Sequence, residues 1–278
     1  MSSYESAGRR QRLSRLHHHD PGGLLVVPLD HAIGAGPIVA GDGLDRLVGC
    51  LAEAGADAVV LHKGAVRRVR PDRFRDLSLV LHLNASTGRA ADPDAKYPVA
   101  TVAEALRAGA DAVSVHVNVG SATEDRQIAH LAQVAGDCDR WGVPLMAMMY
   151  ARGPAIDGRD PEVVAHAVAI AAELGADLVK TALPADETAI ARIVGSSPVP
   201  ILAAGGDPVL RPAPGATSDE KSPGVHGARA VEAALSAAVR AGAAGIAAGR
   251  VVFTAADPGA AVRRLATLVH GRTPAVVR

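Results

Sequence analysis

The chain has 278 residues, a length that suits one large α/β barrel or two smaller domains. Hydrophobic residues make up 49% and aromatic residues only 2%, so the core must be built mainly from small and aliphatic side chains. Because 29 basic residues balance 29 acidic ones and no basic stripe occurs, the composition argues against nucleic acid as a partner. No apolar run reaches membrane-spanning length, so no membrane association is expected.

Residues 1–20 form a polar, basic leader that we expect to be partly flexible, ahead of a single barrel over 21–278. The leader lacks the apolar core of a signal peptide. Its run 17-HHH-19 favours solvated side chains over a metal site, because three adjacent histidines cannot all face one ion. Cys50 and Cys138 show no CxxC or metal-binding spacing, which predicts a reduced cytoplasmic protein without a disulfide framework.

Eight short apolar runs predict strands that are buried on both faces, as in a parallel sheet. Four of them follow a similar junction, seen in 54-AGADAVV and 108-AGADAVS, in which a glycine ends a helix just before a strand. The predicted strands are 24–30, 58–64, 78–84, 112–118, 144–150, 177–183, 200–206 and 245–251.

Amphipathic stretches between these runs predict helices. They cover 42–55, 98–109, 123–142, 160–175, 185–195, 225–242 and 257–271. Asp42, Thr123, Asp160 and Asp257 precede four of them and are predicted N-caps.

This alternation of strands and helices predicts an α/β fold, a single (β/α)8 TIM barrel. A doubly wound open sheet is the alternative, but no GxGxxG follows the first strand. The segment 207–224 is rich in Pro, Gly and Ser, and we expect a mobile loop over the barrel mouth rather than a domain linker.

Active sites of such barrels form at the carboxyl ends of the strands, so the residues found there are candidates for chemistry. In strand order they are Asp30 and His31, His62 and Lys63, His82 and Asn84, His116 and Asn118, Tyr150 and Arg152, Lys180 and Thr181, Gly205 and Gly206, and Gly249 and Arg250.

Lys180 is the candidate nucleophile. The chain has only four lysines against 25 arginines, yet one lies inside the apolar run 178-LVKT. A lysine directed into a barrel loses hydration, which lowers its pKa, and a neutral amine can form a Schiff base with a ketone. The alternatives are a buried ion pair and a side chain that extends to the rim. Lys63 is the rival nucleophile, but its position suggests the rim, where an ion pair is expected.

Imine chemistry also needs groups that move protons, and Asp30 and Tyr150 are suitable in type. Each also has a simpler interpretation, because an aspartate at a strand end often caps a turn and a tyrosine there often fills the mouth. Together with Lys180 they form a credible acid/base set.

The glycine pairs that end the seventh and eighth strands predict a phosphate site, because barrel enzymes often bind phosphate between those two loops. Gly205, Gly206 and Gly249 would expose backbone N–H groups, and Arg250 could add charge. The alternative is that these glycines only permit tight turns. The histidines at 62, 82 and 116 lack carboxylate partners in the strand pattern, so core or rim positions are favoured, and neither a metal nor another cofactor is expected.

Seven motifs follow one another along the barrel: 26-VVPLDHAIGAGP, 60-VLHKG, 113-VSVHVNVGS, 148-MMYARG, 178-LVKT, 203-AAGG and 243-AAGIAAGR. In this order they resemble the class I, Schiff-base aldolase family of archaeal fructose-bisphosphate aldolase type, including its branch of 2-amino-3,7-dideoxy-D-threo-hept-6-ulosonate synthases. The resemblance implies that Lys180 forms the Schiff base, that Tyr150 donates a proton and that Asp30 is a further acid/base. It also implies that substrate is bound by His31, Ala32, Ile33, Gly34, Lys63, Ala151 and Arg152, with phosphate at Gly205, Gly206, Gly249 and Arg250.

The sequence departs from the family pattern where substrate is chosen. Asp30-His31-Ala32 stands where the family has Asp-His-Gly, Ala151 replaces a proline, and Asp207-Pro208 replaces Pro-Lys, a change for which Lys221 is a candidate compensation. These departures suggest the same chemistry on a different acceptor.

The chain also resembles a group in high-GC bacteria that joins dihydroxyacetone phosphate to aspartate 4-semialdehyde, on the way to 3-amino-4-hydroxybenzoate in secondary metabolism, and the resemblance makes this the favoured function. The resemblance also implies a ring-type homo-oligomer. Alternatives are the transaldolase-like heptulosonate synthase, fructose-bisphosphate aldolase, a phosphate-binding barrel isomerase, and a non-catalytic phosphosugar-binding barrel.

Overall fold

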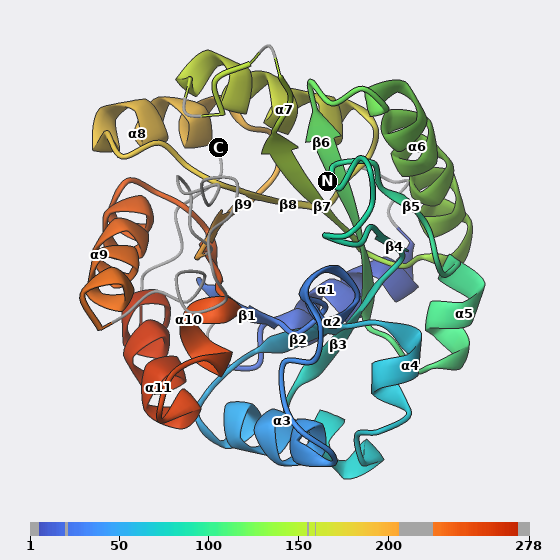
Figure 1. Cartoon of the computed structure of the whole chain (residues 1–278), viewed down its shortest axis with the longest axis vertical. Helices are drawn as coiled ribbons and strands as arrows, with labels where there is room; N and C mark the ends of the chain where they lie inside the picture. Colours follow the sequence, from blue (N-terminus) through green and yellow to red (C-terminus); the bar gives the residue numbers. More distant parts are fainter. Residues whose placement is uncertain (1–5, 20–21, 155, 159, 206–224, 272–278) are drawn as a thin grey trace.

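Eight parallel strands close into a barrel in the computed structural model, which describes residues 6–19, 22–154, 156–158, 160–205 and 225–271 (Figure 1). The strands follow one another around the barrel in chain order, so the predicted TIM barrel is confirmed. They are β1 (Leu24–Pro28), β2 (Ala58–Leu61), β3 (Ser78–His82), β6 (Ala112–Val119), β7 (Leu145–Ala151), β8 (Leu178–Thr181), β9 (Ile201–Ala204) and β10 (Gly245–Ala247).

All seven predicted helices are present and surround the barrel (Figure 1). They are α3 (Gly43–Glu53), α5 (Val102–Arg107), α6 (Glu124–Trp141), α7 (Pro161–Glu173), α8 (Glu187–Ser196), α9 (Val225–Arg240) and α11 (Pro258–Val269). No helix among the described residues is both long enough and apolar enough to cross a membrane.

Two of the four predicted N-caps form capping hydrogen bonds and two do not. Asp160 accepts from Glu162 N, and Asp257 accepts from Ala260 N. The prediction was wrong for Asp42 and Thr123, which occupy N-cap positions without capping. Their side chains are engaged elsewhere, since Asp42 pairs with Arg46 at 3.1 Å and Thr123 accepts from the Gln127 side chain at 3.0 Å.

Several short elements were not predicted, because a segment of two to four residues shows no hydrophobic period. They are α2 (Ala32–Ala35), α4 (Lys63–Val66), the 3₁₀ helix η1 (Pro71–Phe74), α10 (Arg250–Phe253), and the antiparallel pair β4 (Asn84–Ala85) and β5 (Tyr97–Pro98). The elements α2, α4, α10 and β4 each come soon after a barrel strand, and β5 pairs with β4.

The core has two layers because side chains alternate between the two faces of each strand. The larger layer packs the outward side chains against the surrounding helices. The smaller layer fills the barrel interior and consists mostly of Ala, Val, Leu and Met. Its strand members are Leu24, Val26, Ala58, Val60, Val80, Ala112, Met146, Met148, Leu178, Leu202 and Ala247.

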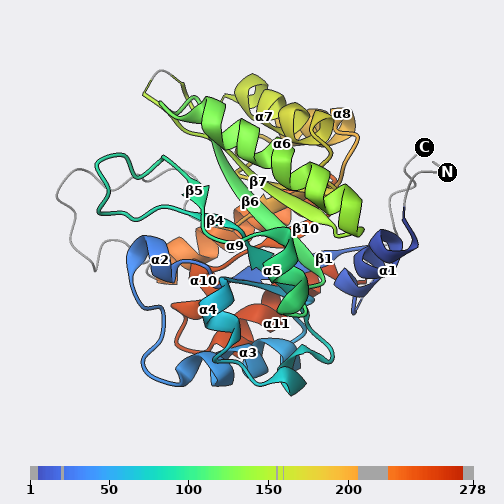
Figure 2. The same cartoon turned by 90° about the vertical axis from the view of Figure 1, so that its right-hand side faces the viewer.

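Helix α1 (Ala7–Leu16) closes the end of the barrel opposite to α2 (Figure 2). Leu16 is 1% exposed and belongs to the interior layer, and Leu13 packs against the same layer. The 17-HHH-19 run is also engaged, since His17 contacts Gly23 O at 3.3 Å and His18 contacts Ser78 Oγ at 3.0 Å. The expectation of solvated side chains was therefore wrong for His17 and His18, which are partly buried, whereas His19 is exposed. One buried leucine in a polar segment gives little sequence signal for this packing.

Replacement of Leu16 by alanine should lower the free energy of unfolding by about 2–4 kcal/mol, because it leaves a cavity in the barrel interior. Leu13→Ala is the matched control and should cost clearly less, since Leu13 is only partly buried. Urea unfolding followed by circular dichroism measures both changes. Equal and negligible losses would show that α1 does not seal the barrel.

Candidate active site

A layer of polar side chains lies above the apolar barrel interior, at the carboxyl ends of the strands. It arises from strand alternation: a residue two positions after an inward-facing one also faces inward. Lys180 follows Leu178 in this way, and Tyr150 follows Met146 and Met148. The layer comprises Asp30, His62, His82, His116, Tyr150 and Lys180. In the strand register, Lys180 pairs with Met148.

Lys180 is buried and forms no ion pair with any residue that the structure describes. Its side chain is 7% exposed, and its Cα pairs with Met148 and Leu202 on the neighbouring strands. Among the described residues, the only hydrogen-bond contact of Nζ is the Met148 sulfur at 4.0 Å. Neither structural alternative holds, because the side chain neither forms an ion pair nor extends to the rim. An amine with one weak acceptor is available to react.

Asp30 follows β1 and exposes 16% of its side chain. Its Oδ2 lies 3.7 Å from His82 Nε2 and its Oδ1 lies 3.5 Å from His31 Nδ1, and Oδ1 is buried without a hydrogen-bond partner within the described residues. Burial raises the pKa of Asp30, but His82, His31 and Lys180 outweigh that effect and hold the pKa well below its usual range. Asp30 is therefore an ionised carboxylate with one oxygen free to accept a proton.

The histidines around Asp30 are neutral near pH 7. Burial lowers the pKa of His82 to about 4 against the attraction of Asp30, and burial also lowers the pKa of His62 and of His116. The His62 and His82 rings lie 5.2 Å apart. The expectation that these histidines lack a carboxylate partner was wrong for His82, because β1 and β3 both direct a side chain into the same interior.

Tyr150 lies near the end of β7, between a histidine and an arginine. Its ring centroid is 4.8 Å from that of His116, and the Arg152 guanidinium carbon lies 4.6 Å from its centroid. Ala151 ends β7, and Arg152 N donates to Val119 O at 2.9 Å, which fixes the segment against β6. The phenol thus has a positive charge over its ring and sits one inward position above Met148, the residue beside Lys180.

The ends of β9 and β10 hold the predicted phosphate residues. Gly205 N donates to Ala247 O at 3.0 Å, and a Cβ on Gly205 would lie 2.5 Å from Ala248 Cβ. A Cβ on Gly249 would lie 2.5 Å from Pro28 O, so close packing requires both glycines. Arg250 begins α10 directly after Gly249. Gly206, Lys221 and the predicted loop 207–224 lie outside the described residues.

The turn after β1 carries the remaining predicted substrate residues. His31 precedes α2, and its ring lies 5.0 Å from that of Phe253 in α10, which connects this turn with the β10 end. Ala32, Ile33 and Gly34 lie within α2. Gly34 O accepts a hydrogen bond from Gly88 N at 2.8 Å, in the segment between β4 and β5.

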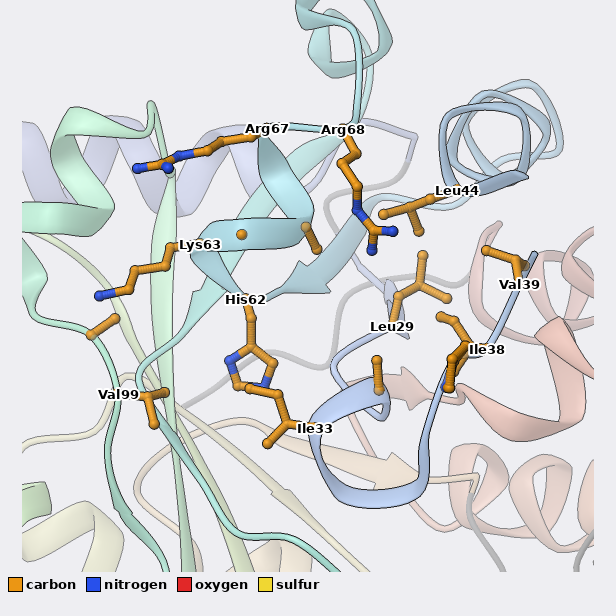
Figure 3. A pocket seen from close by; sticks show the side chains of 15 residues that line it. Leu29, Ile33, Ile38, Val39, Leu44, His62, Lys63, Arg67, Arg68 and Val99 are labelled. Atoms are coloured by element: carbon orange, nitrogen blue, oxygen red, sulfur yellow. The ribbon is translucent and has the colours of Figure 1, made fainter. Parts of the chain in front are cut away.

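A cavity of about 530 Å³ opens beside this turn (Figure 3). Ala32, Ile33 and Lys63 line it together with His62, but Lys180 and Tyr150 do not. The Lys63 ammonium pairs with Glu104 at 2.8 Å and is half-exposed, as expected for a rim lysine. The cavity is therefore an apolar recess next to the polar layer, with Lys63, Arg67 and Arg68 along one edge.

Gln127 and Lys96, which lie near the mouth close to the predicted candidate Asn118, were missed as candidates. Gln127 is fully buried and donates to Asp94 O at 3.0 Å, and Asn118 Nδ2 donates to the same oxygen at 2.8 Å. Lys96 lies two residues after Asp94, in the segment between β4 and β5. The rarity of lysine in the chain could have marked Lys96, and the inward position of Asn118 could have marked this strand end. No sequence pattern, however, predicts that residues 94–96 lie at the end of β6.

The known proteins that are similar to this chain agree on one family. The profile of the DeoC/LacD family aldolase matches residues 24–255. The 2-amino-4,5-dihydroxy-6-oxo-7-(phosphonooxy)heptanoate synthase of Streptomyces griseus is 52% identical over 263 residues, which are 94% of this chain and 90% of that one. The 2-amino-3,7-dideoxy-D-threo-hept-6-ulosonate synthase of Halobacterium salinarum is 42% identical over 95% of this chain and 92% of its own.

The fold also matches solved structures. An archaeal fructose 1,6-bisphosphate aldolase superposes with a TM-score of 0.77 at 27% identity, over 94% of this chain and all of that one. A second such structure, with its catalytic lysine covalently bound to the carbinolamine intermediate, gives 0.76 at 26% identity over the same 94% of this chain and 100% of the other.

Acid should destabilise the fold through His82. Its pKa is about 4 when folded and about 6.5 in an unfolded chain, so the unfolded state binds the proton more tightly between these values. The stabilising contribution is complete above pH 6.5 and declines as the pH falls toward 4. Between pH 7 and 4 the wild type should lose up to about 3 kcal/mol more than His82→Asn.

Urea unfolding of both proteins at pH 7, 5.5 and 4 measures this difference. The other buried histidines are common to both proteins, so the comparison isolates His82. Parallel stability curves for the two proteins would contradict the assignment of His82 as a neutral buried group.

Proposed function

Because the chain belongs to the DeoC/LacD family of aldolases and is a class I, Schiff-base aldolase, we propose that it joins dihydroxyacetone phosphate to aspartate 4-semialdehyde. The observation that carries the chemistry is the buried, unpaired Lys180 amine below an ionised Asp30 and a phenol. The substrates are supported by the Streptomyces relative at 52% identity.

The name of that relative defines its product, and the product's structure defines the bond that an aldolase makes. In a 2-amino-4,5-dihydroxy-6-oxo-7-(phosphonooxy)heptanoate, the carbon next to the ketone is C5 and carries a hydroxyl group. Cleavage between C4 and C5 leaves dihydroxyacetone phosphate from C5–C7 and aspartate 4-semialdehyde from C1–C4. This chain would therefore supply a seven-carbon amino acid phosphate to the route that leads to 3-amino-4-hydroxybenzoate.

The proposed reaction begins at Lys180. The Nζ lone pair of its neutral form attacks the donor ketone carbon, and loss of water leaves an iminium ion. Asp30 takes a proton from the hydroxymethyl carbon to give an enamine. The enamine carbon attacks the aldehyde carbon, and the Tyr150 hydroxyl donates a proton to the new alkoxide. Water then adds to the iminium and releases the ketone product and the amine, and the proton taken from solvent when the carbinolamine lost water returns to solvent. The proton held by Asp30 passes to the Tyr150 oxygen, which restores both groups for the next cycle.

The donor phosphate would bind at the ends of β9 and β10. Gly205 packs against Ala248 and so brings the ends of β9 and β10 close together, while Gly249 packs against Pro28 at the end of β1. Burial lowers the pKa of His31, and the nearby Arg250 charge lowers it further. A phosphate there would lie between the Arg250 guanidinium and backbone N–H groups, as is common in this fold. Gly206 would complete the site from the adjoining segment.

A heptulosonate synthase acting by transaldol transfer is the second candidate, supported by the 42% identity to the Halobacterium enzyme. It shares the Schiff base and the seven-carbon product class but takes a different donor. Turnover of dihydroxyacetone phosphate against a ketose phosphate donor, each with aspartate 4-semialdehyde, separates the two candidates.

The oligomeric state and the cellular location of the protein are inferred from its family likeness and from its cysteines. We infer a homo-oligomer from the resemblance to ring-type aldolases, which light scattering on the purified chain tests directly. Cys50 and Cys138 are free thiols, and this supports a reducing, cytoplasmic location.

Borohydride reduction with dihydroxyacetone phosphate should place one covalent donor adduct on Lys180. Lys180→Ala should give no adduct and no turnover, because no other described lysine lies in the barrel interior. Lys63→Ala should retain the adduct, since its ammonium faces Glu104 at the rim. Peptide mass mapping makes the measurement. An adduct that maps to another lysine, or none in the wild type, would overturn the proposed mechanism.

Tyr150→Phe should lower kcat by about 10²- to 10⁴-fold, because it removes a positioned proton donor. The donor adduct on Lys180 should still form, since its formation precedes proton transfer to the acceptor. Tyr97→Phe is the matched control, because Tyr97 is 47% exposed in β5, and its kcat should stay near that of the wild type. Equal kcat values for the two variants would remove Tyr150 from the mechanism.

A further inference from the structure

The segment between β4 and β5 crosses the mouth of the barrel. On one side Gly88 N donates to Gly34 O at 2.8 Å, in the turn after β1. On the other side Asn118 and Gln127, from β6 and α6, both donate to Asp94 O. β1 and β6 are separated by two other strands around the barrel, so the segment spans this distance above the polar layer. Figure 2 shows β4 and β5 at the same end as α2.

This segment carries a lysine whose charge has no counterion. Lys96 Nζ donates to Ser86 Oγ and lies 3.4 Å from Pro93 O, both of which are neutral oxygens. No carboxylate lies within ion-pair distance of Nζ among the residues that the structure describes. Lys63 differs, because a glutamate neutralises its ammonium at the rim. The neutral contacts hold the Lys96 ammonium in place without pairing with its charge, and the nearest acidic influence comes from carboxylates beyond ion-pair distance.

A second cation lies close to the first. Burial lowers the pKa of Lys96, and the charge of Arg152 lowers it further, while Asp94 and Asp30 act in the opposite direction. Arg152 lies over the Tyr150 ring and, within the described part of the chain, forms no ion pair of its own. Two like charges at one place in a partly buried site are unfavourable unless an anion joins them.

The position of this cation pair matches one end of the proposed product. β6 and β7, which carry Asn118 and Tyr150, lie on the opposite side of the barrel from β10 and its Arg250. A seven-carbon product with phosphate at C7 and carboxylate at C1 needs two anion sites on opposite sides of the Schiff base. The donor phosphate would take the β10 side, which leaves the acceptor carboxylate for Lys96 and Arg152.

We propose that Lys96 and Arg152 form the subsite that binds the carboxylate of the acceptor aldehyde, with Lys96 as a specificity-determining residue. The inference rests on the proposed function. Arg152 offers a planar pair of N–H donors that matches a carboxylate, and Lys96 adds a point charge from the opposite side. The subsite selects the acceptor and takes no part in the proton transfers.

The test compares two acceptors with dihydroxyacetone phosphate as donor: aspartate 4-semialdehyde and butanal, which has the same chain length without charges. Lys96→Met removes the charge and keeps the length of the side chain. It should lower kcat/KM for aspartate 4-semialdehyde by about 10- to 100-fold, mainly through KM, because a hydrogen-bonded charge contact is lost. The kcat/KM for butanal should change less than about twofold, and Lys96→Arg should recover part of the loss.

Arg126→Met is the control, because it removes an exposed cation from α6 and should leave both acceptors unaffected. Equal losses for both aldehydes with Lys96→Met, or no loss for aspartate 4-semialdehyde, would overturn the inference. A wild type that accepts glyceraldehyde 3-phosphate but not aspartate 4-semialdehyde would overturn the carboxylate assignment. Borohydride trapping of the wild type with donor alone distinguishes failure of the proposed function from failure of the subsite assignment. A missing adduct would contradict the proposed function, independently of the result for Lys96→Met.

Discussion

The structure depends on an amine that is buried inside a closed barrel, in electrostatic reach of the Asp30 carboxylate but in no ion pair among the described residues. Below Lys180 lies a layer of aliphatic side chains, and within the described part of the chain its one hydrogen-bond contact is the Met148 sulfur. The barrel places the amine deep in the interior, in one layer with the groups that would move protons, and the closed sheet holds these groups in fixed positions.

The same alternation of side chains places one ionised carboxylate in a layer with neutral histidines. Asp30 stays ionised because positive and polar groups surround it, whereas His82, His62 and His116 stay neutral because they are buried. One layer of the barrel thus holds a charged base beside uncharged rings. The neutral histidines shape the site around the carboxylate without competing for its proton at neutral pH.

The barrel and its main site residues could be predicted from sequence because both rest on local patterns. The apolar run 178-LVKT predicts a strand and at the same time directs Lys180 inward. The segment 84–98 could not be predicted, because its course depends on Asp94 meeting Asn118 and Gln127, which lie far along the chain. Likewise, helix α1 is polar except at a few positions, and only tertiary packing shows that Leu16 enters the barrel.

The two ends of the barrel are unlike, because α1 lies at one end, where Leu16 enters the interior, and α2, β4 and β5 lie at the other (Figure 2). A support or fusion partner attached near the start of α1 would face the sealed end and leave the substrate entrance directed toward solution. An attachment within 86–96 would obstruct that entrance. The amino-terminal side is therefore the suitable place for immobilising this barrel, provided that α1 itself is kept intact.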